Sequence, residues 1–256
     1  MSADKVIVYS FPRASAIPSQ SPFVLKLETF LRMADIQYQC DHRSKFSKKG
    51  KIPWIHCQGD AVADSSFCVE YLQKKFNRFL DADLSEEEKG ISRAFMKMME
   101  ENTIWATIVQ GRIVENFPWF LQAIHVPKAL HFLLKLTLRR KITGYMWSHG
   151  IGRHSNEEIH SIGETDLHAC SQLLGKKPYF MGDQATVIDA TMFGFLAQLL
   201  YDMPDHHWTT ELLVNKYPNL SQFCDRMKNK YWPDWDELLV KGKGGSSKSD
   251  GNENNL

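Results

Sequence analysis

The stretch DATMFGFLAQLLY, residues 189–201, has apolar side chains on nearly every side of the helix that its sequence favours. A helix that is apolar all round is buried, because a surface helix keeps a polar face toward water. The stretch therefore predicts a helix at the centre of a bundle. Amphipathic helical spacing surrounds it, with apolar stripes at Ile91, Phe95, Met98 and Trp105 and at Ile159, Ile162, Leu167, Cys170 and Leu174.

The first 76 residues alternate short extended runs with helical spacing. VIVYSF, residues 6–11, is rich in β-branched and aromatic residues and favours a strand. Helical spacing begins at Pro22, where a missing backbone N–H costs nothing. IQYQC and WIHC look extended, and AVADSSFCVEYLQKKF, residues 61–76, begins as a strand and continues as a helix. The predicted order is strand, helix, strand, strand, strand, helix.

These two patterns divide the chain into domains. We expect residues 1–78 to form one domain, residues 79–85 a linker, and residues 86–240 an all-helical domain, which begins where Ser85 precedes three glutamates. Residues 241–256, KGKGGSSKSDGNENNL, lack apolar anchors, so we expect a flexible tail.

Composition and charge exclude several classes of function. The 256 residues are 43% apolar and 24% charged with a net charge of +1, which is typical of a globular protein and gives no electrostatic basis for nucleic-acid binding. The five cysteines are widely spaced and form no C-x-x-C pair, so the sequence predicts neither a disulfide framework nor a metal site. The start, MSADKVIVYSF, has no signal or transit pattern, so we expect a cytoplasmic protein.

FPWFLQAIHVPKALHFLLKLTLRRK, residues 117–141, is the most apolar stretch of the chain. Spanning a bilayer takes roughly 20 consecutive apolar residues, and Lys128 and Lys135 interrupt this run. We expect a helix that is broken near Pro127 and rests its apolar side on the protein. Peripheral contact of residues 128–141 with a membrane or a partner is the alternative.

Three short features combine a cap or a turn with functional groups. Ser21 precedes Pro22 at a helix start, where a hydroxyl caps backbone N–H groups and the helix pole stabilises an anion such as a thiolate. Pro53 lies before a strand, and a cis peptide bond at this proline would turn the preceding backbone toward a cleft. Asp64 and Ser65 begin a helix, so they either cap it or bind an ammonium and a carboxylate. Taken singly, each feature favours a structural role.

In this order, the three features resemble the glutathione-binding thioredoxin-like domain of the glutathione transferases, and YFMGDQATVIDATMFGFLAQ, residues 179–198, resembles that family's central helix entry. SPFVLKLETFLRMADI, SKKGKIPWI, GIGRHS and YWPDWDE are similar to the failed axon connections branch, near the metaxins. The resemblance implies an α+β fold, with an N-terminal thioredoxin-like domain followed by an all-α glutathione-transferase C-terminal domain. It also implies that Thr186 and Asp189 form a structural capping box.

The resemblance implies roles in thiol chemistry for two residues. Ser21 would face the sulfur of glutathione and donate a hydrogen bond to its thiolate, because a free thiol has a pKa of about 8.5 and is mostly protonated at neutral pH. A serine cannot form the mixed disulfide of the Cys-Pro-Phe relatives, so conjugation is favoured over thiol exchange. Tyr9, at the end of the first strand, is the alternative donor.

Three further residues would bind the peptide part of glutathione. Ile52, directly before Pro53, would offer its backbone N–H and C=O to the cysteinyl moiety. Asp64 and Ser65 would bind the amine and the carboxylate of the γ-glutamyl end.

The edge of the expected cleft departs from the family pattern. Lys51 or Lys48 would pair with the glycyl carboxylate of glutathione, in a region that varies within the family. The long loop of residues 12–20 and the segment 117–141 would border the cleft and either enlarge it for a bulky apolar substrate or fill it.

The sequence thus predicts a glutathione transferase that joins glutathione to a small apolar electrophile or isomerises a bound apolar compound. Glutathione would be the co-substrate, and the helical domain would supply the site of the second substrate. The alternative, which the metaxin-like kinship favours, is a non-catalytic adaptor for protein or membrane contacts. Since many proteins of this fold pair, we also expect a homodimer.

Overall fold

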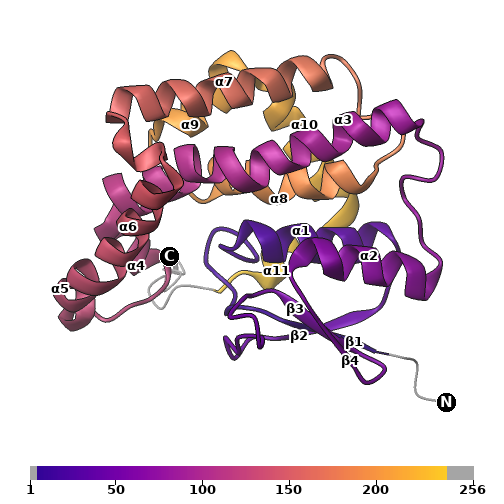
Figure 1. Ribbon diagram of the computed structural model, residues 1–256, viewed down its shortest axis with the longest axis horizontal. Coiled ribbons are helices and arrows are strands. Elements are labelled where there is room, and N and C mark those ends of the chain that lie inside the picture. Colours follow the sequence, from indigo (N-terminus) through magenta and orange to yellow (C-terminus); the bar gives the residue numbers. More distant parts are fainter. Residues whose placement is uncertain (1–4, 241–256) are drawn as a thin grey trace, which may run out of the picture.

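The computed structural model describes residues 5–240. Its elements between residues 6 and 76 follow the predicted order of strands and helices (Figure 1). The elements are β1 (Val6–Tyr9), α1 (Pro22–Met33), β2 (Tyr38–Asp41), β3 (Trp54–Cys57), β4 (Asp60–Ala63) and α2 (Ser65–Phe76). The predicted tail of residues 241–256 lies outside the described residues.

The four strands form one mixed sheet in the order β2-β1-β3-β4. β1 is parallel to β2 and antiparallel to β3, and β3 is antiparallel to β4. Helices α1 and α2 both cover the sheet face that turns toward the rest of the molecule (Figure 1). This is the α+β arrangement that the sequence predicts. Val6 and Val8 alternate with Ile7 along β1 and place their side chains in the core below α1.

The second half is helical throughout. Its elements are α3 (Glu86–Lys97), η1 (Met98–Thr103), η2 (Trp105–Glu115), α4 (Phe117–Ala123), η3 (Lys128–Leu130), α5 (His131–Leu134), η4 (Lys135–Arg139), α6 (Arg140–His149), η5 (Ile151–Arg153), α7 (Asn156–Leu174), α8 (Val187–Tyr201), α9 (Trp208–Glu211), η6 (Leu212–Lys216), α10 (Pro218–Tyr231) and α11 (Trp235–Leu238). Helices η1, η2, η4 and η6 are π-helical, which the apolar spacing did not predict.

Helix α8 is the central helix that its apolar sequence predicts. Of its 15 residues, the 13 from Val187 to Leu199 are buried, and it packs directly on α1 (Figure 1). A methyl group added to Gly194 would lie 2.7 Å from the carbonyl oxygen of Pro22, so only glycine lets the two helix backbones approach this closely. The start of α1 is thereby fixed against the helical domain.

Buried and half-buried ion pairs also connect α1 to later parts of the chain. The Lys26 ammonium lies 2.5 Å from the carboxylate of Glu100 in η1, and both side chains are buried. At the other end of the helix, Arg32 pairs with Asp234 just before α11, and its guanidinium lies over the ring of Trp232. The WPDW motif, residues 232–235, therefore anchors the C-terminal segment.

Segment 117–141 is broken at the predicted place, between the end of α4 at Ala123 and the start of η3 at Lys128. Among residues 5–240, no helix combines the length and the apolar character that crossing a membrane requires.

Candidate functional site

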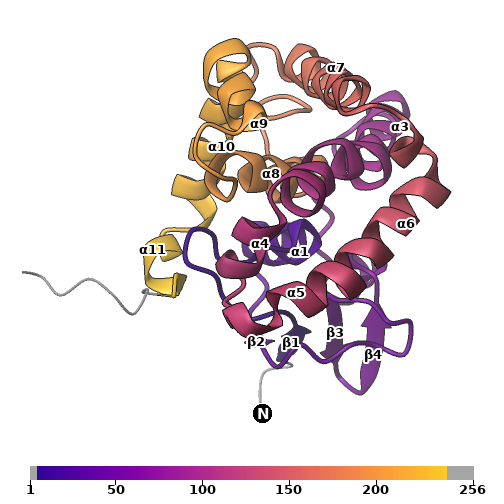
Figure 2. The same ribbon diagram turned by 90° about the vertical axis from the view of Figure 1, so that its left-hand side faces the viewer.

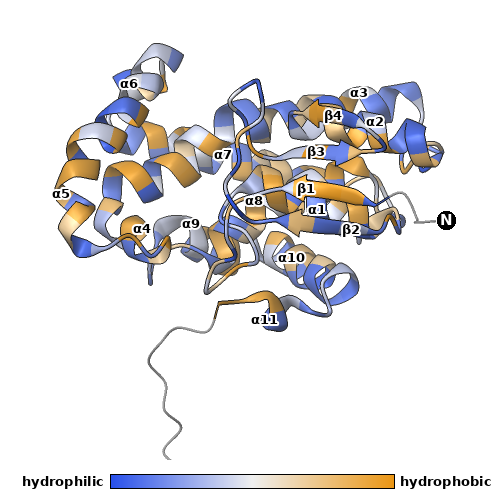
Figure 3. Cartoon of the chain, turned by 90° about the horizontal axis from the view of Figure 1, so that it is seen from below, coloured by the Kyte–Doolittle hydropathy of each residue, from blue (hydrophilic) through white to orange (hydrophobic). Residues whose placement is uncertain are grey.

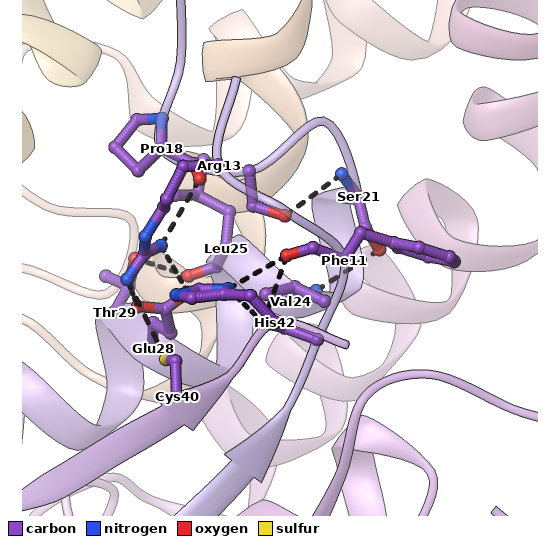
Figure 4. A network of polar contacts seen from close by, with 12 residues as sticks. Phe11, Arg13, Pro18, Ser21, Val24, Leu25, Glu28, Thr29, Cys40 and His42 are labelled. Atoms are coloured by element: carbon purple, nitrogen blue, oxygen red, sulfur yellow. Dashed lines mark hydrogen bonds and ion pairs between the residues drawn. The ribbon is translucent and has the colours of Figure 1, made fainter. Parts of the chain in front are cut away.

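Ser21 caps the first turn of α1 and keeps its hydroxyl proton. Its Oγ accepts a hydrogen bond of 3.4 Å from the backbone N–H of Val24, and Pro22 follows as the first helical residue (Figure 4). A hydroxyl accepts and donates at the same time, so capping leaves the proton of Ser21 available to another group. The start of α1 is also the positive end of the helix dipole, which favours an anion beside Ser21.

The loop between β1 and α1 is held by an ion pair rather than left free. The two terminal nitrogens of Arg13 lie 2.8 and 2.9 Å from the two carboxylate oxygens of Glu28, which is fully buried in α1 (Figure 4). Arg13 also donates to the carbonyl oxygen of Pro18 at 3.2 Å. Two parallel charge-assisted hydrogen bonds fix both position and orientation, so the loop has a defined path past Ser21.

The residues expected to bind the peptide part of glutathione line one cavity. Lys51, Ile52, Pro53, Asp64 and Ser65 surround a hollow of about 310 Å³. The Ile52–Pro53 peptide bond is cis. The remaining lining residues are Phe11, Phe23, Phe46 and Gly50. A polar floor with aromatic walls is typical of a site for a small polar ligand.

Asp64 is an ionised helix cap with a cationic neighbour. Its carboxylate accepts from the backbone N–H of Ser66 at 3.1 Å and lies 2.7 Å from the Lys51 ammonium. Burial alone would raise the pKa of Asp64, but these contacts outweigh it and lower the pKa below its ordinary value. The backbone φ of +89° is rare for a residue other than glycine and is often found at binding sites. Lys51 and Asp64 thus form an ion pair at the edge of this cavity.

Ser21 borders a second, larger cavity of about 470 Å³. One wall comes from the loop after β1, with Phe11, Arg13 and Ala14, and the opposite wall comes from the end of α4, with Phe120 and Ile124. Both segments that were expected to border the cleft are therefore there, and they leave it open. Phe11 lines both cavities.

Tyr9 and Lys48 lie apart from this pair of cavities. The Tyr9 ring stacks on Trp54 in the neighbouring strand, with ring centroids 3.7 Å apart. Among the described residues that line either cavity, Tyr9 and Lys48 do not occur. Lys48 lines a separate hollow with Trp54 and Phe67. The structure thus places Ser21 on the larger cavity and the predicted peptide-binding residues on the smaller one, while Tyr9 lines neither.

Thr186 and Asp189 form a closed polar cluster at the start of α8. The Asp189 carboxylate accepts from the backbone N–H and the hydroxyl of Thr186 and from the backbone N–H of Phe180, at 2.8, 3.0 and 2.8 Å. Burial raises the pKa of Asp189 to about 6, although these hydrogen bonds act in the opposite direction. This arrangement is that of a structural cap.

Several residues that line the cavities were not predicted. Phe11, Phe23, Phe46 and Phe120 form the aromatic walls of the two cavities. Loop and helix-end aromatics carry no local signal for a site, since their positions depend on tertiary contacts such as that of Arg13 with Glu28. The length of the loop was the only usable indication.

Family profiles agree with this architecture. The profile described as Glutathione S-transferase N-terminal domain matches residues 22–113, and the profile described as Glutathione S-transferase, C-terminal domain matches residues 163–227. A beta-etherase from Sphingobium has a similar structure, with a TM-score of 0.60 and 17% identity over 88% of this chain and 95% of that chain. At this identity the likeness shows the fold alone.

Curated relatives are similar over most of this chain. Failed axon connections of Drosophila melanogaster is 36% identical over 93% of this chain, which spans 60% of that longer protein. An isoprene-epoxide glutathione S-transferase of Rhodococcus is 30% identical over 88% of this chain and 99% of its own length. Metaxin-2 of Mus musculus is 26% identical over 82% of both chains. The chain therefore belongs to the glutathione S-transferase family, and within it is similar to Failed axon connections and Metaxin-2.

Proposed function

We propose that this protein is a glutathione transferase that binds glutathione in the smaller cavity and an apolar electrophile in the larger one. The observation that carries the proposal is that one residue, Phe11, lines both cavities. The smaller cavity has an ionised carboxylate and a serine hydroxyl at a helix start, which suit the charged γ-glutamyl end. The larger one has apolar walls and the Ser21 hydroxyl, which suit a thiol and its partner.

In this proposal Ser21 activates the sulfur. Its hydroxyl donates a hydrogen bond to the glutathione thiolate, and the positive end of α1 adds to the stabilisation of the anion. The thiol pKa would fall below its free value of about 8.5, so a larger fraction would be ionised at neutral pH. Because serine supplies no sulfur of its own, the sulfur of glutathione is the nucleophile.

The name of the Rhodococcus relative supports an epoxide as one class of electrophile. The thiolate sulfur would attack a ring carbon, the C–S bond would form as the C–O bond breaks, and the resulting alkoxide would take a proton from water. Such a substrate is small and apolar, which fits the Phe120 and Ile124 side of the cavity. A reducing compartment such as the cytoplasm would keep glutathione in its thiol form.

A second proposal is a non-catalytic adaptor, to which the likeness to Failed axon connections and Metaxin-2 gives support. The Lys51–Asp64 ion pair favours it, because the ammonium of glutathione would have to compete with Lys51 for the same carboxylate. The two proposals differ in a simple property: an adaptor of this kind needs no affinity for glutathione.

Calorimetric titration of glutathione tests the transferase proposal. Asp64→Asn keeps the helix cap, since asparagine caps as well as aspartate, but removes the charge. We expect its affinity for glutathione to fall about tenfold, which is typical of a lost charge-assisted hydrogen bond at a half-exposed site. Asp83→Asn, in the exposed linker, is the matched control and should bind like wild type. Wild type that shows no heat of binding would support the adaptor instead.

A further inference from the structure

The helices η3, α5, η4 and α6, residues 128–149, form an arm at one end of the molecule (Figures 1 and 2). Its outer side exposes large apolar residues in α5 and η4 and, further along the chain, in α6. The hydropathy colouring of Figure 3 shows hydrophobic residues along α5. The exposed fractions are 73% for Phe132, 55% for Leu133, 46% for Leu136 and 59% for Trp147. Contiguous exposed apolar side chains of this size mark an interaction surface.

The charge of this region is as uneven as its hydropathy. Residues 116–156 contain six lysines and arginines, at positions 128, 135, 139, 140, 141 and 153, and no aspartate or glutamate. All 30 acidic residues lie in the other 215 positions, with 25 basic ones, so the segment has a net charge of +6 and the remainder −5. Such separation attracts an anionic surface to this one side.

The arm is anchored to the protein through its inner side. Leu134, Leu138 and Ile142 pack against a small core under the arm. That core consists of Ile113, Phe117 and Leu121. Arg139 donates to the carbonyl oxygens of Ile113 and Val114 at 3.0 and 2.9 Å. The outer apolar face is therefore presented by a helix that already has a packed side, and its exposure is not a sign of loose packing.

We infer that the outer face of the arm binds the surface of an anionic lipid bilayer. A helix with apolar residues on one face and lysines and arginines beside them lies in the plane of the interface, with the apolar side chains among the acyl chains and the cations at the headgroups. Lys135, Arg140 and Lys141 are exposed and flank the apolar residues. A protein groove would need carboxylates to match these cations, whereas an anionic bilayer supplies charge along the whole arm.

Lipid binding would also place the larger cavity near the membrane. The arm follows directly on α4, whose end lines that cavity. Apolar compounds dissolved in the bilayer would then be close to the cavity mouth. The inference does not depend on the transferase proposal, because it rests on the surface of the arm alone.

Vesicle co-sedimentation of the full chain tests the apolar half of the inference. Wild type should bind vesicles of phosphatidylcholine with phosphatidylserine more tightly than phosphatidylcholine alone, and less tightly as salt is raised. The triple variant Phe132→Ser, Leu133→Ser and Leu136→Ser should lose at least tenfold in affinity for both. Phe79→Ser with Val214→Ser is the matched control, at exposed apolar residues on other helices and loops, and should bind like wild type.

A second set of variants tests the role of the positive charges of the arm. Lys135→Glu, Arg140→Glu and Lys141→Glu should reduce binding to phosphatidylserine vesicles to the level of phosphatidylcholine alone, whereas Lys74→Glu with Lys75→Glu on α2 should not. Thermal melting confirms that each variant is folded. Failure of wild type to bind, or apolar and charge variants that bind like wild type, would overturn the inference. So would a wild-type dimer in analytical ultracentrifugation that the apolar variant dissociates, because the face would then bind a second copy.

Discussion

Helices α1 and α8 both begin with a hydroxyl residue, but the two starts differ in what surrounds them. At α8, Thr186 is 4% exposed and Asp189 is fully buried, and the carboxylate accepts hydrogen bonds from Thr186 and Phe180. At α1, the Ser21 hydroxyl accepts one hydrogen bond from Val24 and also borders a cavity of about 470 Å³. The two helix starts share the capping chemistry, but the cap of α1 borders a cavity whereas the cap of α8 is buried.

This difference in burial indicates which helix cap is also a candidate binding group. At the start of α8 the cap partners are buried in the protein, so their contribution is to stability. At the start of α1 the Ser21 hydroxyl, at the positive end of the helix dipole, borders the larger cavity. The same residue type can therefore act on a ligand there. Substitutions at the two starts should therefore affect different properties.

The largest expected effect is on stability at α8. Asp189→Ala removes the acceptor for two buried backbone N–H groups, and it should lower the free energy of unfolding by about 3 kcal/mol. Urea unfolding followed by circular dichroism measures this. Asp183→Ala, at an exposed residue close by, should change stability by less than about 0.5 kcal/mol. Loss of ligand affinity in a still folded Asp189→Ala protein would contradict a purely structural role.

The next effect is on turnover at α1. Ser21→Ala should reduce conjugation of an aromatic or epoxide electrophile about 100-fold, or roughly 2.7 kcal/mol, and leave glutathione affinity nearly unchanged. Ser161→Ala, at an exposed serine of α7 that lines neither cavity, is the matched control and should retain activity. Ser21→Cys should lose conjugation and gain reduction of mixed glutathione disulfides. Equal conjugation rates in wild type and Ser21→Ala would reduce Ser21 to a cap.

A smaller effect concerns pH. Burial raises the pKa of Asp189 to about 6, above its ordinary value of 3.8, so the folded state holds a proton that the unfolded state has released between these values. Stability should therefore fall by about 2 kcal/mol as pH rises from about 4 to 6. In Asp189→Asn this component should vanish, which parallel unfolding curves at several pH values would measure. The same slope in both proteins would exclude Asp189 as its source.

Most of the fold could be predicted because its signals are local. The apolar composition of α8 and the alternation of β1 depend on neighbouring residues only, and they indicate burial without knowledge of the partners. The π-helical turns of η1 and η2 were not predicted, since the same apolar residues fit an α-helix as well.

The candidate site was predictable in part for a different reason. Ile52, Pro53, Asp64 and Ser65 come together because the resemblance fixes the strand order, and the antiparallel β3–β4 pair then brings the two segments side by side. The place of Phe11 in the lining of both cavities could not be predicted. The loop that carries Phe11 is positioned by the ion pair of Arg13 with Glu28, whose side chains are 15 residues apart in the sequence.

The thiol pKa of bound glutathione tests the central claim most directly. The ultraviolet absorbance of the thiolate, followed against pH with the protein in excess, reports this pKa. In wild type we expect a value at least one pH unit below that of the free thiol, which is about 8.5, and in Ser21→Ala a value close to the free one. Glutathione that binds both proteins with the same thiol pKa would contradict the claim that the Ser21 hydroxyl activates the sulfur.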